Sequence, residues 1–185
     1  MEGYTWTLRV SATERGQATV FTRQHQFRVG APVHFDRAYE AVSALEYVLG
    51  AIGGDLVNGL QTLGRRRRVT IEQVEAVVEA ELNNPLTYLG VVGEAGHPGL
   101  EKVRVRVYVA SSSDEVAIQR LWQEMLATSP LVHTFQAATG LLPCATLIAT
   151  GCRTSSPRQR VASRPSQICA VKPWRWARRT PRRRP

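Results

Sequence analysis

Residues 43–64 read SALEYVLGAIGGDLVNGLQTLG, and this stretch decides the fold. Its apolar residues cover more than one face of a helix, and glycines and alanines fill much of the remainder. A helix that is apolar nearly all round is buried, and its glycines favour close packing of another backbone. Ser43 is the expected N-cap and Gly64 the expected stop. We therefore predict a long buried central helix over residues 43–64.

The segments on either side of this helix alternate apolar and polar residues, which is the pattern of strands with one wet face. Such segments lie at 4–10, 18–22, 25–29, 74–82 and 103–109. The first three form an expected meander within residues 1–40. Two helices follow the last strand, one capped by Ser112 with Glu115 and one starting at Pro130. This order of strands and helices indicates an α+β fold.

The positive charge of the chain is concentrated at its C-terminal end. The formal net charge is +9, and residues 151–185 contain 11 Arg and Lys but no Asp or Glu. Residues 1–150 are left with 13 basic and 15 acidic residues, a net charge of −2. The expected folded part is therefore mildly acidic, which argues against a nucleic-acid-binding domain there.

The basic Arg/Pro-rich tail, residues 141–185, has three interpretations. Arginines and the indoles of Trp174 and Trp176 suit a nucleic-acid-binding arm. The composition also suits a disordered appendage. A reading-frame shift in GC-rich DNA would produce the same mixture of residues. Because acidic residues disappear where all three cysteines appear, we favour a disordered or frame-shifted tail, and we expect no nucleic-acid partner for the remainder.

The sequence offers no pattern for a metal, a cofactor or a membrane. Three cysteines, Cys144, Cys152 and Cys169, form neither a CxxC nor a Cys/His motif, so neither zinc nor a disulfide framework is expected. His25, His34 and His97 lack ligand spacing. The N-terminus does not resemble a signal peptide, and no run approaches the ~18 apolar residues of a membrane span. We expect a cytoplasmic protein without a cofactor.

Two segments of the chain resemble the OsmC/Ohr (osmotically inducible protein C / organic hydroperoxide resistance) family. The stretch from Ser43 to Asp55 is similar to the family pattern S-P-x-E-L-L-L-A-A-L-A-G-C, and Ser129-Pro-Leu-Val-His133-Thr-Phe135 is similar to C-P-V-S-N-T-L. The resemblance covers residues 1–140, with a second αβ half at 66–140. It implies an OsmC-like fold, in which antiparallel sheets pack around the long central helix of an intertwined homodimer.

The resemblance implies that Asp55 and Ser129 occupy the positions of the two redox cysteines. Family members reduce organic hydroperoxides with a thiolate, which becomes a sulfenic acid that the second thiol captures. A carboxylate and a hydroxyl cannot perform this chemistry, so the chain is expected to be a degenerate member that is not a thiol peroxidase. The family's supporting arginine corresponds to Arg15. Its glutamate position is held by Leu45, with Glu46 one residue away.

Several functions remain open for this site. The family's pocket at the dimer interface would bind a small apolar ligand. By resemblance alone, the chain would instead be an organic hydroperoxide reductase of the oxidative stress response. Ser129, His133 and Asp55 also suggest a Ser/His/Asp hydrolase, although no nucleophile elbow is visible. A non-catalytic scaffold is the remaining alternative. Because the family cysteines can form a disulfide, the resemblance places Asp55 and Ser129 near hydrogen-bonding distance.

Overall fold

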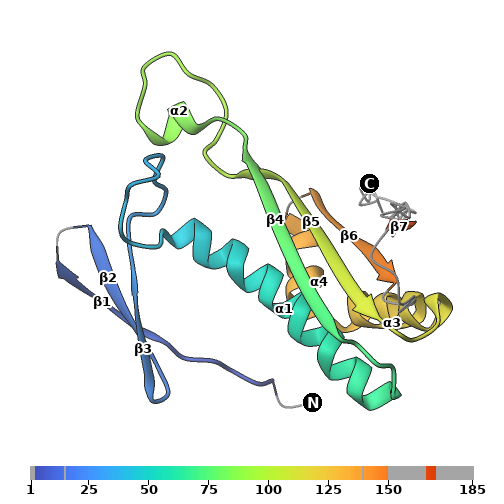
Figure 1. The fold of residues 1–185 in the computed structure, drawn as a ribbon. Helices are drawn as coiled ribbons and strands as arrows, with labels where there is room; N and C mark the ends of the chain where they lie inside the picture. Colours follow the sequence, from blue (N-terminus) through green and yellow to red (C-terminus); the bar gives the residue numbers. More distant parts are fainter. Residues whose placement is uncertain (1–2, 15, 139, 150–165, 170–185) are drawn as a thin grey trace, which may run out of the picture.

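The computed structural model of the protein describes residues 3–14, 16–138, 140–149 and 166–169. Arg15 and most of the basic tail therefore lie outside the described residues, and the expectations for them are not addressed by the fold. Within the described ranges, the chain forms two separate sheets and four helices, which confirms the α+β class (Figure 1).

The N-terminal sheet is an antiparallel meander of three strands in the order β1-β2-β3. Its strands are β1 (Arg9–Glu14), β2 (Gln17–Thr22) and β3 (His25–Val29). The first strand begins later than the alternation at 4–10 predicts. Tyr4 and Trp6 contact each other edge to face, but they are 78% and 75% exposed, and no strand of the described residues pairs with their segment.

The second sheet has four strands in the order β4-β5-β6-β7. These are β4 (Gln73–Leu82), β5 (Leu100–Ser111), β6 (Gly140–Ala149) and β7 (Ser166–Cys169). The β5–β6 pair is parallel and the others are antiparallel, so the expectation of purely antiparallel sheets is wrong at this pair. The strand β6 begins at Gly140 and pairs with β5 throughout, so residues 141–149 at the start of the expected tail lie in this sheet.

Four helices complete the described fold: α1 (Ala44–Arg67), α2 (Pro85–Tyr88), α3 (Glu115–Thr128) and α4 (Pro130–Ala138). The helices α3 and α4 form the crossover that the parallel β5–β6 pair requires. Asp114, not Ser112, precedes α3, and its side chain makes no cap hydrogen bond. Among the described residues, no helix combines the length and apolar character of a membrane span.

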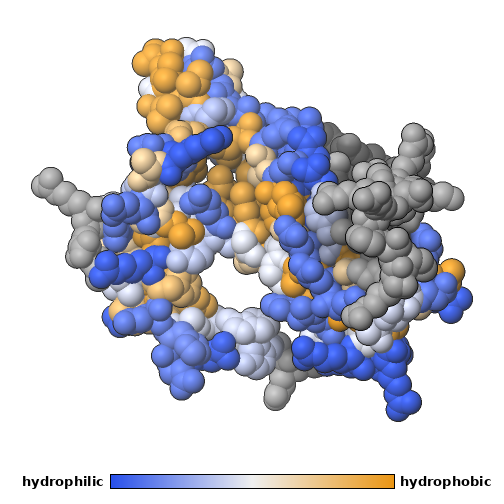
Figure 2. Space-filling view, in the orientation of Figure 1, coloured by the Kyte–Doolittle hydropathy of each residue, from blue (hydrophilic) through white to orange (hydrophobic). Residues whose placement is uncertain are grey.

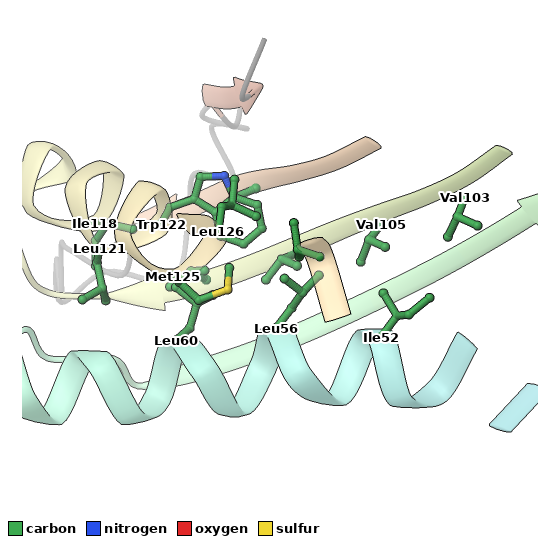
Figure 3. Close-up of a cluster of buried hydrophobic side chains, with 14 residues drawn as sticks. Ile52, Leu56, Leu60, Val103, Val105, Ile118, Leu121, Trp122, Met125 and Leu126 are labelled. Atoms are coloured by element: carbon green, nitrogen blue, oxygen red, sulfur yellow. The ribbon is translucent and has the colours of Figure 1, made fainter. Parts of the chain in front are cut away.

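The hydrophobic core lies between one face of the four-stranded sheet and the helices α1, α3 and α4 (Figure 3). The sheet contributes four valines of β5, Val103, Val105, Val107 and Val109, each at most 1% exposed. The helix α3 contributes Trp122, which is fully buried, together with Met125. The opposite face of the sheet is charged, with ion pairs between Arg104 and Glu81 and between Arg106 and Glu79.

The central helix α1 is only half covered by the rest of the described chain. Its buried positions form one stripe: Ile52, Gly53, Leu56, Leu60 and Gly64. On the other side, Val48 is 37% exposed, and a Cβ added at Gly50 or Gly54 would meet nothing within 4 Å. The all-round burial that the sequence predicts is therefore not reached within one chain.

Candidate functional site

Asp55 and Ser129 meet where the middle of α1 passes the junction between α3 and α4. The Ser129 hydroxyl donates a hydrogen bond to Asp55 Oδ2. The two residues therefore lie as close together as the sequence resemblance implies. The same hydroxyl accepts a hydrogen bond from the Val132 N–H at 3.0 Å. Ser129 is 5% exposed and Asp55 is half-buried. The serine hydroxyl is thus used both as a donor and as an acceptor.

Ser129 also shapes the backbone around the site. Ser129 is the C-cap of α3, where its backbone is extended and its N–H donates to the Met125 carbonyl at 2.9 Å. Its hydroxyl caps the first turn of α4. Pro130 follows at the first position of α4, where a missing N–H costs nothing. The residue therefore has a structural role at a helix–helix corner as well as its contact with Asp55.

A groove of about 330 Å³ opens beside this pair. Its lining is Asp55, Asn58, Gly59, Thr62, Leu63, Arg66, Met125, Thr128, Ser129 and Pro130. The α1 residues at 55, 58, 62 and 66 recur every three or four positions and so share one face of the helix. The sequence pattern did not indicate this polar stripe, because apolar residues stand between its members along the chain. The groove therefore combines this polar stripe with apolar side chains, among them Leu63, Met125 and Pro130.

His133 does not complete a catalytic triad with Ser129 and Asp55. Its ring is exposed, and Nε2 lies 2.9 Å from the Ala127 carbonyl oxygen. In a triad the histidine lies between the acid and the serine, whereas here Ser129 donates directly to Asp55. No hydrogen bond between the His133 ring and the Ser129 hydroxyl is present in the described part of the chain.

Glu46 lies at the start of α1, more than two helical turns before Asp55. Its Oε2 accepts the Ser43 N–H at 2.7 Å, and its own N–H donates to the Ser43 hydroxyl at 3.2 Å. The hydrogen bond from the Ser43 N–H, followed by that from its hydroxyl, lowers the Glu46 pKa. This reciprocal capping box assigns Glu46 a structural position, and the Ser43-x-x-Glu46 spacing was its sequence signal.

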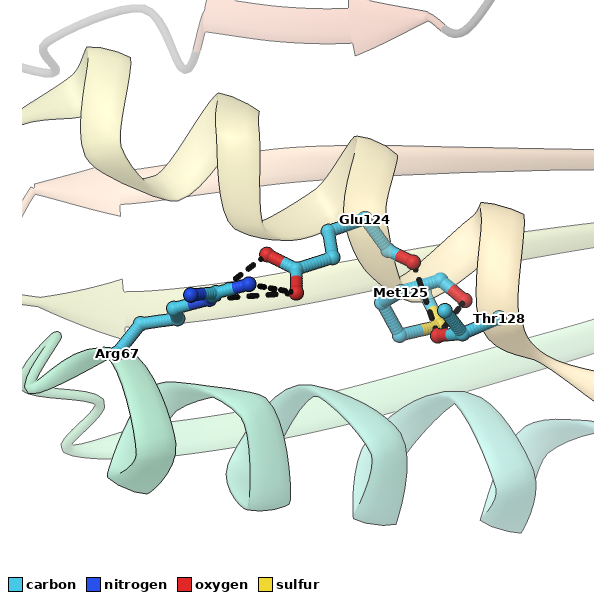
Figure 4. A network of polar contacts seen from close by, with 4 residues as sticks. All are labelled: Arg67, Glu124, Met125 and Thr128. Atoms are coloured by element: carbon cyan, nitrogen blue, oxygen red, sulfur yellow. Dashed lines mark hydrogen bonds and ion pairs between the residues drawn. The ribbon is translucent and has the colours of Figure 1, made fainter.

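An ion pair fixes α3 against α1 beside the groove (Figure 4). The Arg67 guanidinium donates to both carboxylate oxygens of Glu124, at 2.6 to 3.2 Å. Hydrogen bonding to Arg67 lowers the Glu124 pKa, and the same bonds raise the Arg67 pKa. Thr128 donates to the Glu124 carbonyl at 2.9 Å. Among the described residues, no cluster of three His, Cys, Asp or Glu is arranged for a metal.

The two-sheet α+β fold, with a central helix facing a helix–helix corner, is shared by solved structures of OsmC-like proteins. A family model for OsmC-like protein matches residues 37–141, and the chain therefore belongs to the OsmC-like family. That range includes both Asp55 and Ser129. No curated protein matches the chain, so the family assignment rests on the family model and is supported by the fold.

Solved structures share this fold at low sequence identity. An OsmC-like protein from Mycoplasma pneumoniae is 15% identical with a TM-score of 0.65, covering 80% of this chain and 99% of its own. The organic hydroperoxide resistance protein OsmC from Legionella pneumophila is 10% identical, with a TM-score of 0.56 and coverage of 80% and 98%. A Vibrio cholerae protein named for organic hydroperoxide resistance holds captopril in one of its active sites. It is 9% identical, with a TM-score of 0.54 and coverage of 81% and 95%.

Proposed function

We propose that this OsmC-like protein binds a small, largely apolar organic ligand in the groove beside Asp55 and is not a thiol peroxidase. The hydrogen bond from Ser129 to Asp55 carries the proposal. It joins, through oxygen atoms, the two residues that the sequence resemblance places at the positions of the family's cysteines. Neither oxygen can pass through the sulfenic acid and disulfide stages of a peroxidase. Cys144 lies on β6 and does not line the groove.

Asp55 is the proposed anchor of the ligand. Its Oδ2 accepts the Ser129 hydroxyl, whereas no residue of the described chain donates to Oδ1. An amine or hydroxyl of a ligand would bind this oxygen, while the ligand's apolar body would contact Leu63, Met125 and Pro130. Captopril in an active site of the Vibrio cholerae protein supports the ability of this fold to hold a small organic molecule.

Peroxide consumption tests the first part of the proposal. We expect the purified protein to consume no cumene hydroperoxide in the presence of a dithiol. The double variant Asp55→Cys with Ser129→Cys is the positive control, because it returns sulfur to both positions. Turnover by the wild-type chain that is lost when all three cysteines are replaced by serine would be thiol-dependent. It would contradict the proposal and favour the reductase alternative suggested by the family name.

Ligand binding tests the second part. Calorimetric titration of the whole protein with octylamine is expected to give saturable binding, because the amine meets Asp55 and the alkyl chain meets the groove wall. Asp55→Asn should weaken it about tenfold or more, since it removes a charge-assisted hydrogen bond. Glu46→Gln is the control, because it changes a carboxylate on the same helix outside the groove. Equal affinities for the wild type and Asp55→Asn would exclude Asp55 as the anchor.

We also propose that the protein is a homodimer in which a second copy covers the open side of α1. Three features support this: the space beside Gly50 and Gly54, the exposure of Val48, and the exposed Tyr4 and Trp6. Apolar side chains line the hollow between the N-terminal sheet and the remainder of the protomer (Figure 2). Burial of such surface is the main driving force of protein association.

Light scattering tests the homodimer. The wild-type protein is expected at twice its chain mass at micromolar concentration. Gly54→Leu should shift it to a monomer, because the new side chain projects into space that is empty in the protomer. Circular dichroism should be unchanged, which separates loss of association from loss of folding. A wild-type monomer, or an unaffected Gly54→Leu dimer, would rule out this interface.

A further inference from the structure

The groove has opposite charges at its two ends. Asp55 and Arg66 both line it and lie on the same stripe of α1. They are about three helical turns apart, or about 16 Å along the helix axis. Asn58 and Thr62 lie between them on the same stripe. The chain thus presents an anion and a cation along one continuous binding surface, and not a single anchor.

Both charges retain unused hydrogen-bonding capacity. Asp55 Oδ1 accepts no hydrogen bond within the described residues, although Oδ2 binds Ser129. Arg66 forms no ion pair or hydrogen bond there, whereas Nε and Nη2 of the adjacent Arg67 donate to Glu124. No ion pair joins Arg66 to Asp55. Each end of the groove is therefore available to an opposite charge on a ligand.

The middle of the groove limits the shape of that ligand. Leu63, Met125 and Pro130 form its apolar wall, which suits methylene groups. The volume of about 330 Å³ lies near the lower end of the range for small-molecule pockets. A short, extended molecule fits these dimensions better than a fused ring system or a long lipid chain.

We propose that the groove selects a short zwitterion, with an ammonium group bound by Asp55 and a carboxylate bound by Arg66. This inference rests on the proposed function and adds a ligand class to it: ω-amino acids or short peptides, whose charges are separated by an extended chain. Arg66 is then the residue that determines specificity. A guanidinium can bind a carboxylate through two parallel N–H donors, so Arg66 discriminates zwitterions from simple amines.

The test compares three ligands of matched chain length on the whole protein by calorimetry at low salt: 8-aminooctanoate, octylamine and octanoate. The zwitterion is expected to bind about tenfold more tightly than either singly charged compound, because each removes one charged hydrogen-bonding pair. Arg66→Gln should remove the advantage of 8-aminooctanoate over octylamine, because it removes the group that binds the carboxylate.

Arg65→Gln is the matched control, because it removes one positive charge from an exposed neighbour outside the groove. It should leave all three affinities unchanged. Equal affinities for 8-aminooctanoate and octylamine would overturn the zwitterion proposal. Loss of 8-aminooctanoate binding in both arginine variants would also overturn it. Neither result would contradict the binding of amines by Asp55. Octanoate binding as strong as that of the zwitterion would also overturn it. Absence of binding by all three compounds would overturn the proposed function as well.

Discussion

The four-stranded half of the protomer and its N-terminal sheet differ in how much of their apolar surface they bury. In the four-stranded half, the inward-facing valines of β5 are at most 1% exposed. The apolar residues of α3 between Ile118 and Met125 are at most 2% exposed. In the N-terminal sheet, Val20 is the one buried apolar residue of the described parts of β1–β3, with 8% of its surface exposed. It does not belong to the main core. One half has a complete core, and the other does not.

This difference indicates where each half obtains its stability. The helices α1 and α3 and the second sheet cover each other within one chain. The N-terminal sheet leaves Val10 59% and Trp6 75% exposed, although such residues favour burial. A small sheet without a covered face is marginal on its own. We therefore expect the N-terminal sheet to depend on the proposed second copy, and the following predictions test this contrast.

The largest effect is expected at Trp122. Trp122→Ala should lower the free energy of unfolding by about 3–5 kcal/mol, because it opens a cavity in the main hydrophobic core. Trp122→Phe should cost less. It retains an aromatic ring and removes an indole N–H that is buried without a partner in the described chain. Urea denaturation measures both, and equal losses for the two variants would argue against a cavity as the cause.

A smaller effect is expected at Ser129. Ser129→Ala should cost about 1–2 kcal/mol, because α4 loses its N-terminal cap and Asp55 loses a donor. The adjacent Thr128→Ala is the matched control. Thr128 is exposed and bonds only to carbonyls of its own helix, so its loss should cost no more than about 0.5 kcal/mol. Urea denaturation measures the free energy of unfolding of both variants. Similar losses for Ser129→Ala and Thr128→Ala would contradict the structural role of Ser129 between α3 and α4.

Trp6→Ala should separate the two halves. It is expected to change the unfolding free energy of an isolated protomer by no more than about 0.5 kcal/mol, because the side chain is exposed there. It should nevertheless raise the dimer dissociation constant about tenfold or more, as loss of a large aromatic from an interface does. Sedimentation across a dilution series gives that constant. An unchanged constant would mean that this part of the N-terminal segment lies outside the interface.

The smallest effect is the contribution of two glutamates to acid stability. Hydrogen bonds lower the pKa values of Glu46 and Glu124 in the folded protein. The unfolded chain therefore binds protons first, so this stability is complete above the unfolded value of about 4.3 and is lost as pH falls through the folded pKa values. Glu46→Gln and Glu124→Gln should each make unfolding less pH-dependent below that value. If the unfolding free energy of either variant varies with pH in parallel with that of the wild type, the lowered pKa of that glutamate is contradicted.

Much of the fold could be predicted from the sequence because local patterns and final packing agree there. The expected helix at 43–64 is observed at Ala44–Arg67 with Ser43 as its cap, and the added turn consists of arginines, which favour helix. The alternation at 74–82 became β4. The short helix α2 was missed, although Asn84-Pro85 carries the cap-and-proline signal that begins it.

The parts that could not be predicted depend on contacts between distant residues or between chains. Alternation at residues 4–10 indicated a strand, but a strand requires a pairing partner, and this protomer provides one only from Arg9 onward. Asp55 and Ser129 could be paired only through the family resemblance, because no local pattern links residues so far apart. No sequence pattern indicates a groove beside Arg66, and only the position of α3 shows that this residue lines one.

The corner at Ser129 has a consequence for the kinetics of ligand binding. Because one residue ends α3, caps α4 and holds Asp55, the floor of the groove is already organised before a ligand arrives. A preorganised site loses little conformational entropy on binding, and its backbone moves little between the free and bound states. Association should then be a single fast step whose rate is set by diffusion and the local electric field, and affinities should differ mainly in how slowly the ligand leaves.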